Sequence, residues 1–115
     1  MKRLNQFFFH VNIPPQVSIG KRLILPHGGF GVIINKKTQI GDDAIIFQNV
    51  TIGNVGALIG NRVVIGAGAV ILGGIEIGDD VYIGANTFLN FDVPSQSTVV
   101  GPKGKIIHRM KNQSR

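Results

Sequence analysis

The sequence predicts an all-β fold in which short parallel strands stack into a triangular prism, and three regularities of its 115 residues lead to this prediction. The first is the dipeptide Ile-Gly, which recurs at multiples of six residues apart from two small insertions and begins at Ile19, Ile40, Ile52, Ile59, Ile65, Ile77 and Ile83. The second is a set of further apolar residues in the same register: Ile13, Leu25, Ile34, Ile46, Ile71 and Leu89. The third is a small or β-branched residue four positions after these: Val17, Thr38, Ala44, Val50, Val63, Ala69, Val81, Thr87 and Val93.

Each six-residue unit is expected to supply one short strand and one turn, with its apolar residue pointing inward. The Gly, Asn or Asp that follows the apolar residue accepts left-handed backbone angles at low steric cost. Three units close one coil, so the repeat region holds about four to five coils, stacked at the strand spacing of roughly 4.8 Å. A long helix is not expected, because apolar residues at period six do not form a 3.6-residue stripe. The period leaves the handedness open, and the general rule for parallel crossovers is right-handed.

The extent of the six-residue repeat divides the chain into three predicted segments. Residues 1–12 lack the period and end in an apolar stretch that suits a cap over the open end of the stack. The β-helix itself is expected over residues 13–100, with its regular pattern ending at Phe91-Asp92-Val93-Pro94. Residues 101–115 form a basic C-terminal segment, and we expect an extended strand from Val99 to Ile107.

The net charge of +6 is concentrated at the two ends of the chain, because residues 4–100 carry five basic groups against six acidic ones. A solvated tail or a phosphate-bearing ligand is therefore favoured over nucleic acid, for which no aromatic platform or recognised motif is present. The absence of cysteine excludes a disulfide framework and a cysteine nucleophile. No apolar stretch is long enough for a signal h-region or a membrane span, so we expect a cytoplasmic protein without membrane contact.

Two insertions interrupt the period, and insertions that protrude from a rigid scaffold are where function usually lies. One adds a single residue near Gly53-Asn54-Val55-Gly56-Ala57. The other adds three residues within Pro26-His27-Gly28-Gly29-Phe30-Gly31-Val32 and contains the only histidine of the repeat region. A three-histidine zinc site is not expected, because His10, His27 and His108 do not have the close spacing that such a site requires.

These residues resemble the hexapeptide-repeat acyltransferases, above all the catalytic domain of serine O-acetyltransferases and of related sugar and capsular-polysaccharide O-acetyltransferases. The resemblance covers about residues 12–107. Besides the Ile-Gly hexads, it rests on four motifs: the stretch from Leu25 to Ile34, Gln48-Asn49-Val50-Thr51-Ile52-Gly53, Ile65-Gly66-Ala67-Gly68-Ala69, and Asp92-Val93-Pro94 leading to Val99-Val100-Gly101.

The resemblance implies a left-handed parallel β-helix that assembles as a homotrimer, with acetyl coenzyme A in the cleft between two subunits and no metal. It also implies that His27 is the catalytic base. By the same resemblance, the backbone at Gly53, Ala67 and Ala85 would meet the pantetheine arm. Lys103 and Lys105 would lie where the phosphates of the cofactor could be met.

Several positions depart from the serine enzymes. The aspartate that pairs with their base, fifteen residues before it, is replaced by Asn12, and the aspartate just before the histidine is replaced by Pro26. The loop that brings an arginine-histidine pair toward serine is shortened to residues 54–58. We therefore expect the acceptor to be a hydroxyl of a sugar or polysaccharide unit, with serine as the alternative.

The chemistry of acetyl transfer to a hydroxyl fits these residues. Neutral imidazole can accept the hydroxyl proton, so His27 is the expected general base. Asn12 could orient the ring, although a neutral amide stabilises the imidazolium less than a carboxylate does. We expect direct transfer without an acyl-enzyme, with backbone N–H groups stabilising the oxyanion. The alternatives to this enzyme are a non-catalytic β-helix scaffold and, less favoured, a basic nucleic-acid binder.

Overall fold

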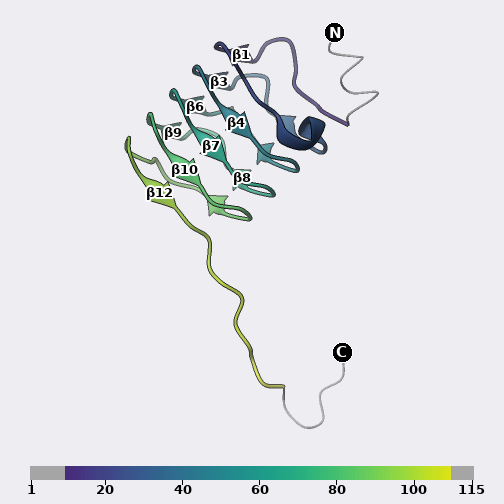
Figure 1. The fold of residues 1–115 in the computed structure, drawn as a ribbon, viewed down its shortest axis with the longest axis vertical. Coiled ribbons are helices and arrows are strands. Elements are labelled where there is room, and N and C mark those ends of the chain that lie inside the picture. Colours follow the sequence, from purple (N-terminus) through teal and green to yellow (C-terminus); the bar gives the residue numbers. More distant parts are fainter. Residues whose placement is uncertain (1–9, 110–115) are drawn as a thin grey trace.

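The fold is a prism of stacked coils in a computed structural model that describes residues 10–109 (Figure 1). Every strand is two residues long, and one short 3-10 helix, η1 (Pro26–Gly29), occupies the larger insertion. The strands are β1 (Ser18–Ile19), β2 (Ile33–Ile34), β3 (Gln39–Ile40), β4 (Ile45–Ile46), β5 (Thr51–Ile52), β6 (Leu58–Ile59), β7 (Val64–Ile65), β8 (Val70–Ile71), β9 (Glu76–Ile77), β10 (Tyr82–Ile83), β11 (Phe88–Leu89) and β12 (Thr98–Val99).

Three parallel sheets form the faces of the prism. Face A consists of β2, β5, β8 and β11, face B of β1, β3, β6 and β9, and face C of β4, β7, β10 and β12. One isolated bridge extends each sheet, so that each face has five rungs; the bridges are Asn12↔Ile33, Ile77↔Val93 and Ile24↔Ile45. The predicted β-helix of four to five coils is thus confirmed, and its coils wind left-handed, as the resemblance implied.

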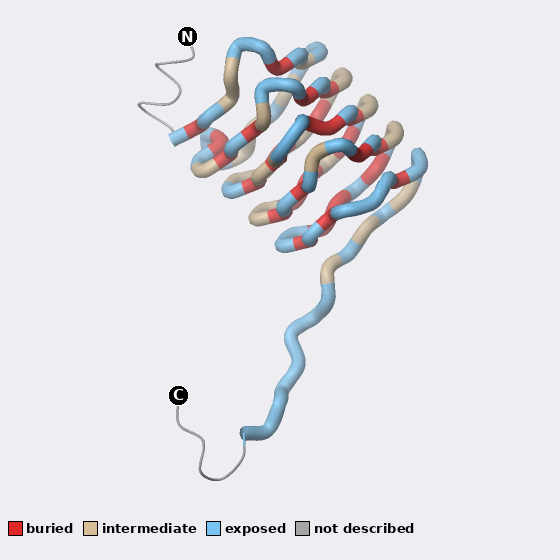
Figure 2. The backbone as a smooth tube through the Cα atoms, turned by 180° about the vertical axis from the view of Figure 1, so that it is seen from behind, coloured by how far each residue is buried: buried red, intermediate tan, exposed pale blue. Residues whose placement is uncertain are grey.

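The core is the column of inward residues that the period predicted. Its largest members are completely buried: Ile34, Ile46, Ile52, Ile65, Ile71, Ile83 and Leu89. The small or β-branched position is buried in every coil too, from Val17 to Val93. Figure 2 shows the buried residues returning at the same places along the stack, which means that each coil buries its apolar side chains against its neighbours.

The glycines of the Ile-Gly pairs have a different role from the one expected. None of them has a left-handed φ; the left-handed residue lies two positions later, as at Asp43, Arg62 and Asp80. Close stacking explains these glycines instead. A Cβ atom on Gly41 would lie 2.7 Å from the carbonyl oxygen of Gly60, and one on Gly60 would lie 2.8 Å from that of Gly78.

The C-terminal end also differs from the expectation. The stack continues beyond Pro94, because Val93 bridges to face B and β12 pairs with β10. Thr98 is paired with Tyr82 and Tyr82 with Val64, so the last coil is two residues shorter than the one before it. The expected strand from Val99 to Ile107 is wrong: β12 ends at Val99, and the residues from Pro102 to Arg109 form an exposed arm that runs away from the stack (Figures 1 and 2).

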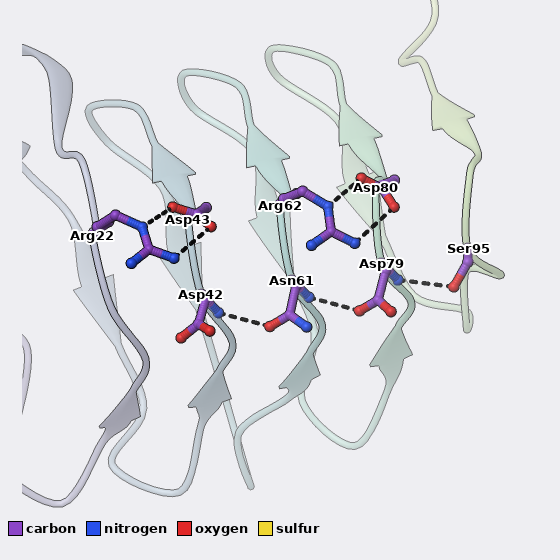
Figure 3. Close-up of polar contacts among 8 residues, drawn as sticks. All are labelled: Arg22, Asp42, Asp43, Asn61, Arg62, Asp79, Asp80 and Ser95. Atoms are coloured by element: carbon purple, nitrogen blue, oxygen red, sulfur yellow. Dashed lines mark hydrogen bonds and ion pairs between the residues drawn. The ribbon is translucent and has the colours of Figure 1, made fainter.

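The corner between faces B and C carries a polar ladder, and we call it the ladder corner; it comprises residues 20–22, 41–43, 60–62, 78–80 and 95–96. Backbone N–H groups donate to side-chain oxygens of the next coil, from Asp42 to Asn61 Oδ1 at 2.8 Å, from Asn61 to Asp79 Oδ1 at 2.7 Å, and from Asp79 to Ser95 Oγ at 2.9 Å (Figure 3). These bonds satisfy groups that a turn would otherwise leave to water.

Two bidentate ion pairs lie beside the ladder. Arg22 Nε donates to Asp43 Oδ1 at 2.5 Å, and Arg62 Nε donates to Asp80 Oδ1 at 2.7 Å (Figure 3). Hydrogen bonding and then charge attraction from these arginines lower the pKa of Asp43 and of Asp80. All four groups are solvent-exposed.

The expected cap falls mostly outside the described residues, since residues 1–9 are not among them. Of its remainder, Val11 is buried in the core and the Asn12 N–H donates to the carbonyl of Val32 at 2.8 Å. Within residues 10–109, the structure has no helix whose length and hydropathy would suit a membrane span.

Candidate active site

The loop that bears His27 replaces the ordinary turn between faces C and A. It begins as η1, where Pro26 occupies the first turn and Gly28 N–H donates to the carbonyl of Leu25 at 3.1 Å. His27 itself has a left-handed φ of 59°, followed by φ of 70° at Gly28. A left-handed φ is shared by turn residues of the other coils, such as Asp43 and Arg62, so it belongs to the turn and does not set His27 apart. The loop holds the His27 side chain in an exposed position.

Contacts on both sides hold this loop. Gly29 is buried, and a Cβ atom there would lie 3.1 Å from Val11 Cγ2, so only glycine allows the loop to approach the core this closely. Gly31 N–H donates to the carbonyl of His10 at 3.0 Å, and Asn49 N–H donates to the carbonyl of Phe30 at 2.8 Å. The His27 loop is therefore bonded both to the residues that precede the repeat and to the coil below it.

The same corner continues down the stack, and we call it the histidine corner; it comprises residues 26–32, 47–49, 66–68 and 84–86. Gly68 N–H donates to the carbonyl of Gln48 at 3.0 Å, and Asn86 N–H donates to the carbonyl of Ala67 at 2.8 Å. The structure thus brings Ala67 and Ala85 into one column with the His27 loop. The lower coils stack closely here: a Cβ atom on Gly66 would lie 2.6 Å from the backbone nitrogen of Ala85.

The C-terminal arm starts from this corner as well. A Cβ atom on Gly101 would lie 3.4 Å from the carbonyl oxygen of Asn86, so the chain passes the lower end of the histidine corner as it leaves the stack. Lys103 and Lys105 follow in the exposed arm. The two basic residues are thus near in sequence to the corner but extend beyond the last coil.

Asn12 and Gly53 lie elsewhere. They line a groove of about 350 Å³ along face A, together with Ile33, Lys36 and Thr51. Asn12 bridges to Ile33, directly after the His27 loop, whereas Gly53 follows β5 at the far edge of the face. Asn12 N–H donates to the carbonyl of Val32 at the end of the His27 loop. Of the predicted site residues in the repeat, Gly53 is therefore the one that lies across face A from the His27 loop.

Gln48 is a residue of this corner to which the sequence analysis gave no role. It lies in the coil below His27, at the hexad position that Ala67 and Ala85 occupy in the next two coils. Its Oε1 is buried and has no hydrogen-bond donor among the described residues. An unpartnered buried carbonyl costs about 1–3 kcal/mol. Comparison of this hexad position across coils would have identified the residue from sequence.

Other surfaces offer less chemistry. A larger groove, of about 730 Å³, runs along face B and is lined by residues that include Gln39, Leu58, Glu76 and Asp92, on the face that the histidine corner does not border. Among residues 10–109 no three His, Cys, Asp or Glu side chains are grouped closely enough to hold a metal ion.

Comparison with known proteins gives one family model and many relatives. The model described as bacterial transferase hexapeptide (six repeats) matches residues 56–90. A serine acetyltransferase of Helicobacter pylori strain 26695 is 45% identical over 114 residues, which cover 93% of this chain and 66% of that protein. A serine acetyltransferase of Staphylococcus aureus strain Mu50 is 43% identical, with 93% of this chain and 53% of that protein covered. The chain thus spans less than two thirds of the length of these curated relatives.

Solved structures give the same result. The chain superposes on serine acetyltransferase isoform 3 of Entamoeba histolytica, in complex with cysteine, with a TM-score of 0.82 and 33% identity over 93% of this chain and 40% of that one. It superposes equally well, with a TM-score of 0.82 and 34% identity, on a serine acetyltransferase in complex with CoA, over 92% of this chain and 45% of that one.

Proposed function

We propose that this chain, which belongs to the bacterial transferase hexapeptide family of acyltransferases, transfers the acetyl group of acetyl coenzyme A to the hydroxyl of L-serine. The observation that carries the proposal is the 45% identity to a serine acetyltransferase over 93% of the chain. It favours serine, the alternative of the sequence analysis, over the sugar hydroxyl that was expected first. Asn12 and Pro26 still depart from the serine enzymes, and they are the reason to test a saccharide acceptor beside serine.

In this proposal His27 is the general base. Its exposed ring accepts the proton of the acceptor hydroxyl as the hydroxyl oxygen attacks the thioester carbonyl, and it returns the proton to the departing sulfur. Acetyl coenzyme A supplies the acetyl group. Asn12 is proposed to orient the His27 ring. Its hydrogen bond to Val32, at the end of the histidine loop, supports this positioning role. A neutral amide there stabilises the imidazolium less than a carboxylate, which implies slower turnover.

The histidine corner fits the acyl donor. Small residues predominate in the two lower coils of the corner, so an extended arm can approach the backbone at Ala67 and Ala85, and a Cβ atom on Gly66 or Gly68 would not fit. From the His27 loop to residues 84–86 the corner spans three rungs, about 14 Å at the spacing of parallel strands. Lys103 and Lys105 lie beyond its lower end, where they suit the phosphates. Gly53 lies on another edge, so its contact with the donor requires a neighbouring subunit.

A homotrimer would supply that neighbour, and the outward residues of the three faces support one. Faces A and C expose apolar side chains: Ile33, Val70, Phe88, Ile24 and Tyr82. Face B is the polar face, with Ser18, Gln39, Glu76 and Asp92 outward around a single Leu58. Exposed apolar rows of this extent are typical of subunit interfaces. Sedimentation equilibrium is expected to give three times the chain mass, and a monomer would contradict the proposal.

The function is tested by assaying coenzyme A release with a panel of hydroxyl acceptors. We expect release with L-serine and little with sugars at the same concentration. Release with a sugar but not with serine would restore the saccharide reading. If no acceptor is acetylated and coenzyme A does not raise the melting temperature at millimolar concentration, the chain is the scaffold that the sequence analysis considered.

A further inference from the structure

Gln48 is the exception in the histidine corner. At its hexad position, the next two coils carry the small residues Ala67 and Ala85, whereas the coil below His27 carries a primary amide. Its Oε1 is buried without a donor, although the residue as a whole is half-buried and so reaches the surface. Buried carbonyl oxygens are hydrogen-bonded in native proteins almost without exception. The missing donor is therefore either ordered water or a group from outside residues 10–109 of this chain.

We propose that the side-chain amide of Gln48 binds the acyl donor by hydrogen bonding to the amide of the pantetheine arm nearest the thioester, an inference that rests on the proposed function. A primary amide suits this partner, because it offers both a donor and an acceptor to a secondary amide. The terminal torsion of glutamine is broad, so Oε1 can turn toward the surface without a change of the backbone.

The order of residues along the histidine corner indicates which of the two pantetheine amides lies beside Gln48. The thioester has to lie beside His27 for the base to reach the attacking hydroxyl. Two methylene groups separate the sulfur from the first amide nitrogen, a length close to one rung of the stack, roughly 4.8 Å. Gln48 lies one rung below the His27 loop, as the bond from Asn49 N–H to the carbonyl of Phe30 shows. The second amide of the arm lies further down, beside Ala67.

The test compares Gln48→Met with Gln39→Met by calorimetric titration of coenzyme A. Methionine keeps the length of the side chain and removes its hydrogen bonds, and Gln39 is an exposed glutamine on face B that serves as the matched control. We expect the Kd of coenzyme A to rise about 3- to 10-fold in Gln48→Met, the equivalent of one net hydrogen bond, and to stay unchanged in Gln39→Met. The melting temperature of Gln48→Met is expected to equal or exceed that of the unmodified protein, because an orphaned polar atom is removed.

An acetyl donor with a truncated pantetheine arm then tests which amide of the arm binds Gln48. The acetyl thioester of N-acetylcysteamine contains only the amide nearest the sulfur, so Gln48→Met is expected to raise the KM for this donor by the same factor as the KM for acetyl coenzyme A, with the KM for serine unchanged. A loss confined to acetyl coenzyme A would overturn the assignment to this amide.

Other outcomes separate this inference from the proposed function. If the unmodified protein binds coenzyme A and Gln48→Met binds it equally well, the role of Gln48 is overturned and the function stands. If the unmodified protein neither binds coenzyme A nor acetylates an acceptor, both are overturned. If Gln48→Met does not fold, the side-chain amide signals of Gln48 in the unmodified protein decide by NMR: they are expected to shift on addition of coenzyme A, and unchanged signals overturn the proposal.

Discussion

The ladder corner and the histidine corner are built from the same hexad, yet they treat their polar groups in opposite ways. At the ladder corner, Asp42, Asn61 and Asp79 are each joined to a neighbouring coil by a hydrogen bond between a backbone N–H and a side-chain oxygen. At the histidine corner, the equivalent positions are Gln48, Ala67 and Ala85: the alanines have no polar side chain, and Gln48 has a buried oxygen without a donor among the described residues.

This difference shows at which corner the polar groups of the chain are hydrogen-bonded to one another and at which corner they are available to a ligand. Backbone groups that side chains already cap have little to offer a ligand, so the ladder corner contributes to stability. Alanine and glycine in the two lower coils of the histidine corner let a ligand approach the backbone, and this corner contributes less to stability because fewer of its polar groups are paired. Substitutions at the two corners are therefore expected to separate activity from stability.

The largest expected effect belongs to the histidine corner. His27→Ala removes the proposed base, and general-base catalysis contributes roughly 100- to 10,000-fold, so turnover is expected to fall by that factor. Coenzyme A release under saturating substrates measures it. Because His27 has a left-handed φ, His27→Asn is the better-folded second variant, since asparagine accepts that region more readily.

His108→Asn, in the exposed arm, is the matched control for His27→Asn and is expected to leave turnover unchanged. If His27→Ala and His27→Asn both keep the rate of the unmodified protein, His27 is not the base, and the histidine corner loses its catalytic role.

The next effect belongs to the ladder corner. A methyl group on Gly60 would lie 2.8 Å from backbone atoms of Gly78 and closer still to Asp79 Oδ1, which accepts from Asn61 N–H. Overpacking of this kind costs about 1–3 kcal/mol, so Gly60→Ala is expected to lower the free energy of unfolding by that amount. Urea titration at fixed protein concentration measures the change, while the Kd of coenzyme A is expected to stay unchanged. Full stability in Gly60→Ala would contradict the account of the Ile-Gly glycines as stacking residues.

A smaller effect is expected at Gly53, where no atom lies within 4 Å of a Cβ position. Gly53→Ala restricts the unfolded chain, and such changes stabilise by about 0.4–1 kcal/mol where the native backbone allows alanine. If Gly53 meets the acyl donor of a neighbouring subunit, the same variant binds coenzyme A more weakly in calorimetric titration. Unchanged binding would remove Gly53 from the donor site and leave it an ordinary turn residue.

A feature of the fold could be predicted from the sequence where it recurs in every coil, and could not where it occurs once or depends on the distance between coils. The core positions recur in every coil, so the stack and its buried residues could be predicted from the period alone. The reason for the Ile-Gly glycines could not, because the distance between Gly41 and Gly60 depends on how closely successive coils approach. The short last coil was missed because a coil that lacks two residues breaks the six-residue period. In the sequence, that break cannot be told from the end of the repeat.

The candidate site was predictable only in part for a related reason. The interruption of the period marked the loop of His27, and the fold brings Ala67 and Ala85 into line with it. Gln48 was overlooked because it belongs to no functional motif. It is conspicuous only when the same hexad position is compared with the next two coils, which carry Ala67 and Ala85. Asn12 was paired with His27 by resemblance, whereas its position in the fold depends on a complete coil between them, after which it bridges to Ile33 directly behind the His27 loop.

The smallest expected effect concerns the Arg22–Asp43 and Arg62–Asp80 pairs of the ladder corner. The arginines lower the folded-state pKa of both carboxyls, so the pairs contribute stability above the unfolded value, about 3.9. That contribution is lost as the pH falls through the folded pKa values, below about 3.9. The double variant Asp43→Asn, Asp80→Asn is therefore expected to melt slightly below the unmodified protein at pH 6, and the difference is expected to shrink as the pH falls below about 3.9.

Salt and a control variant separate the ion pairs from net charge. At 1 M salt the screening length is about 3 Å, so the difference at pH 6 is expected to shrink for these exposed groups. Glu76→Gln removes an exposed carboxylate that has no ion pair among residues 10–109, and it is expected to leave the melting temperature unchanged. If the double variant melts with the unmodified protein at pH 6 and low salt, the backbone ladder alone stabilises this corner. The contrast with the histidine corner would then rest on the bonds of Asp42, Asn61 and Asp79.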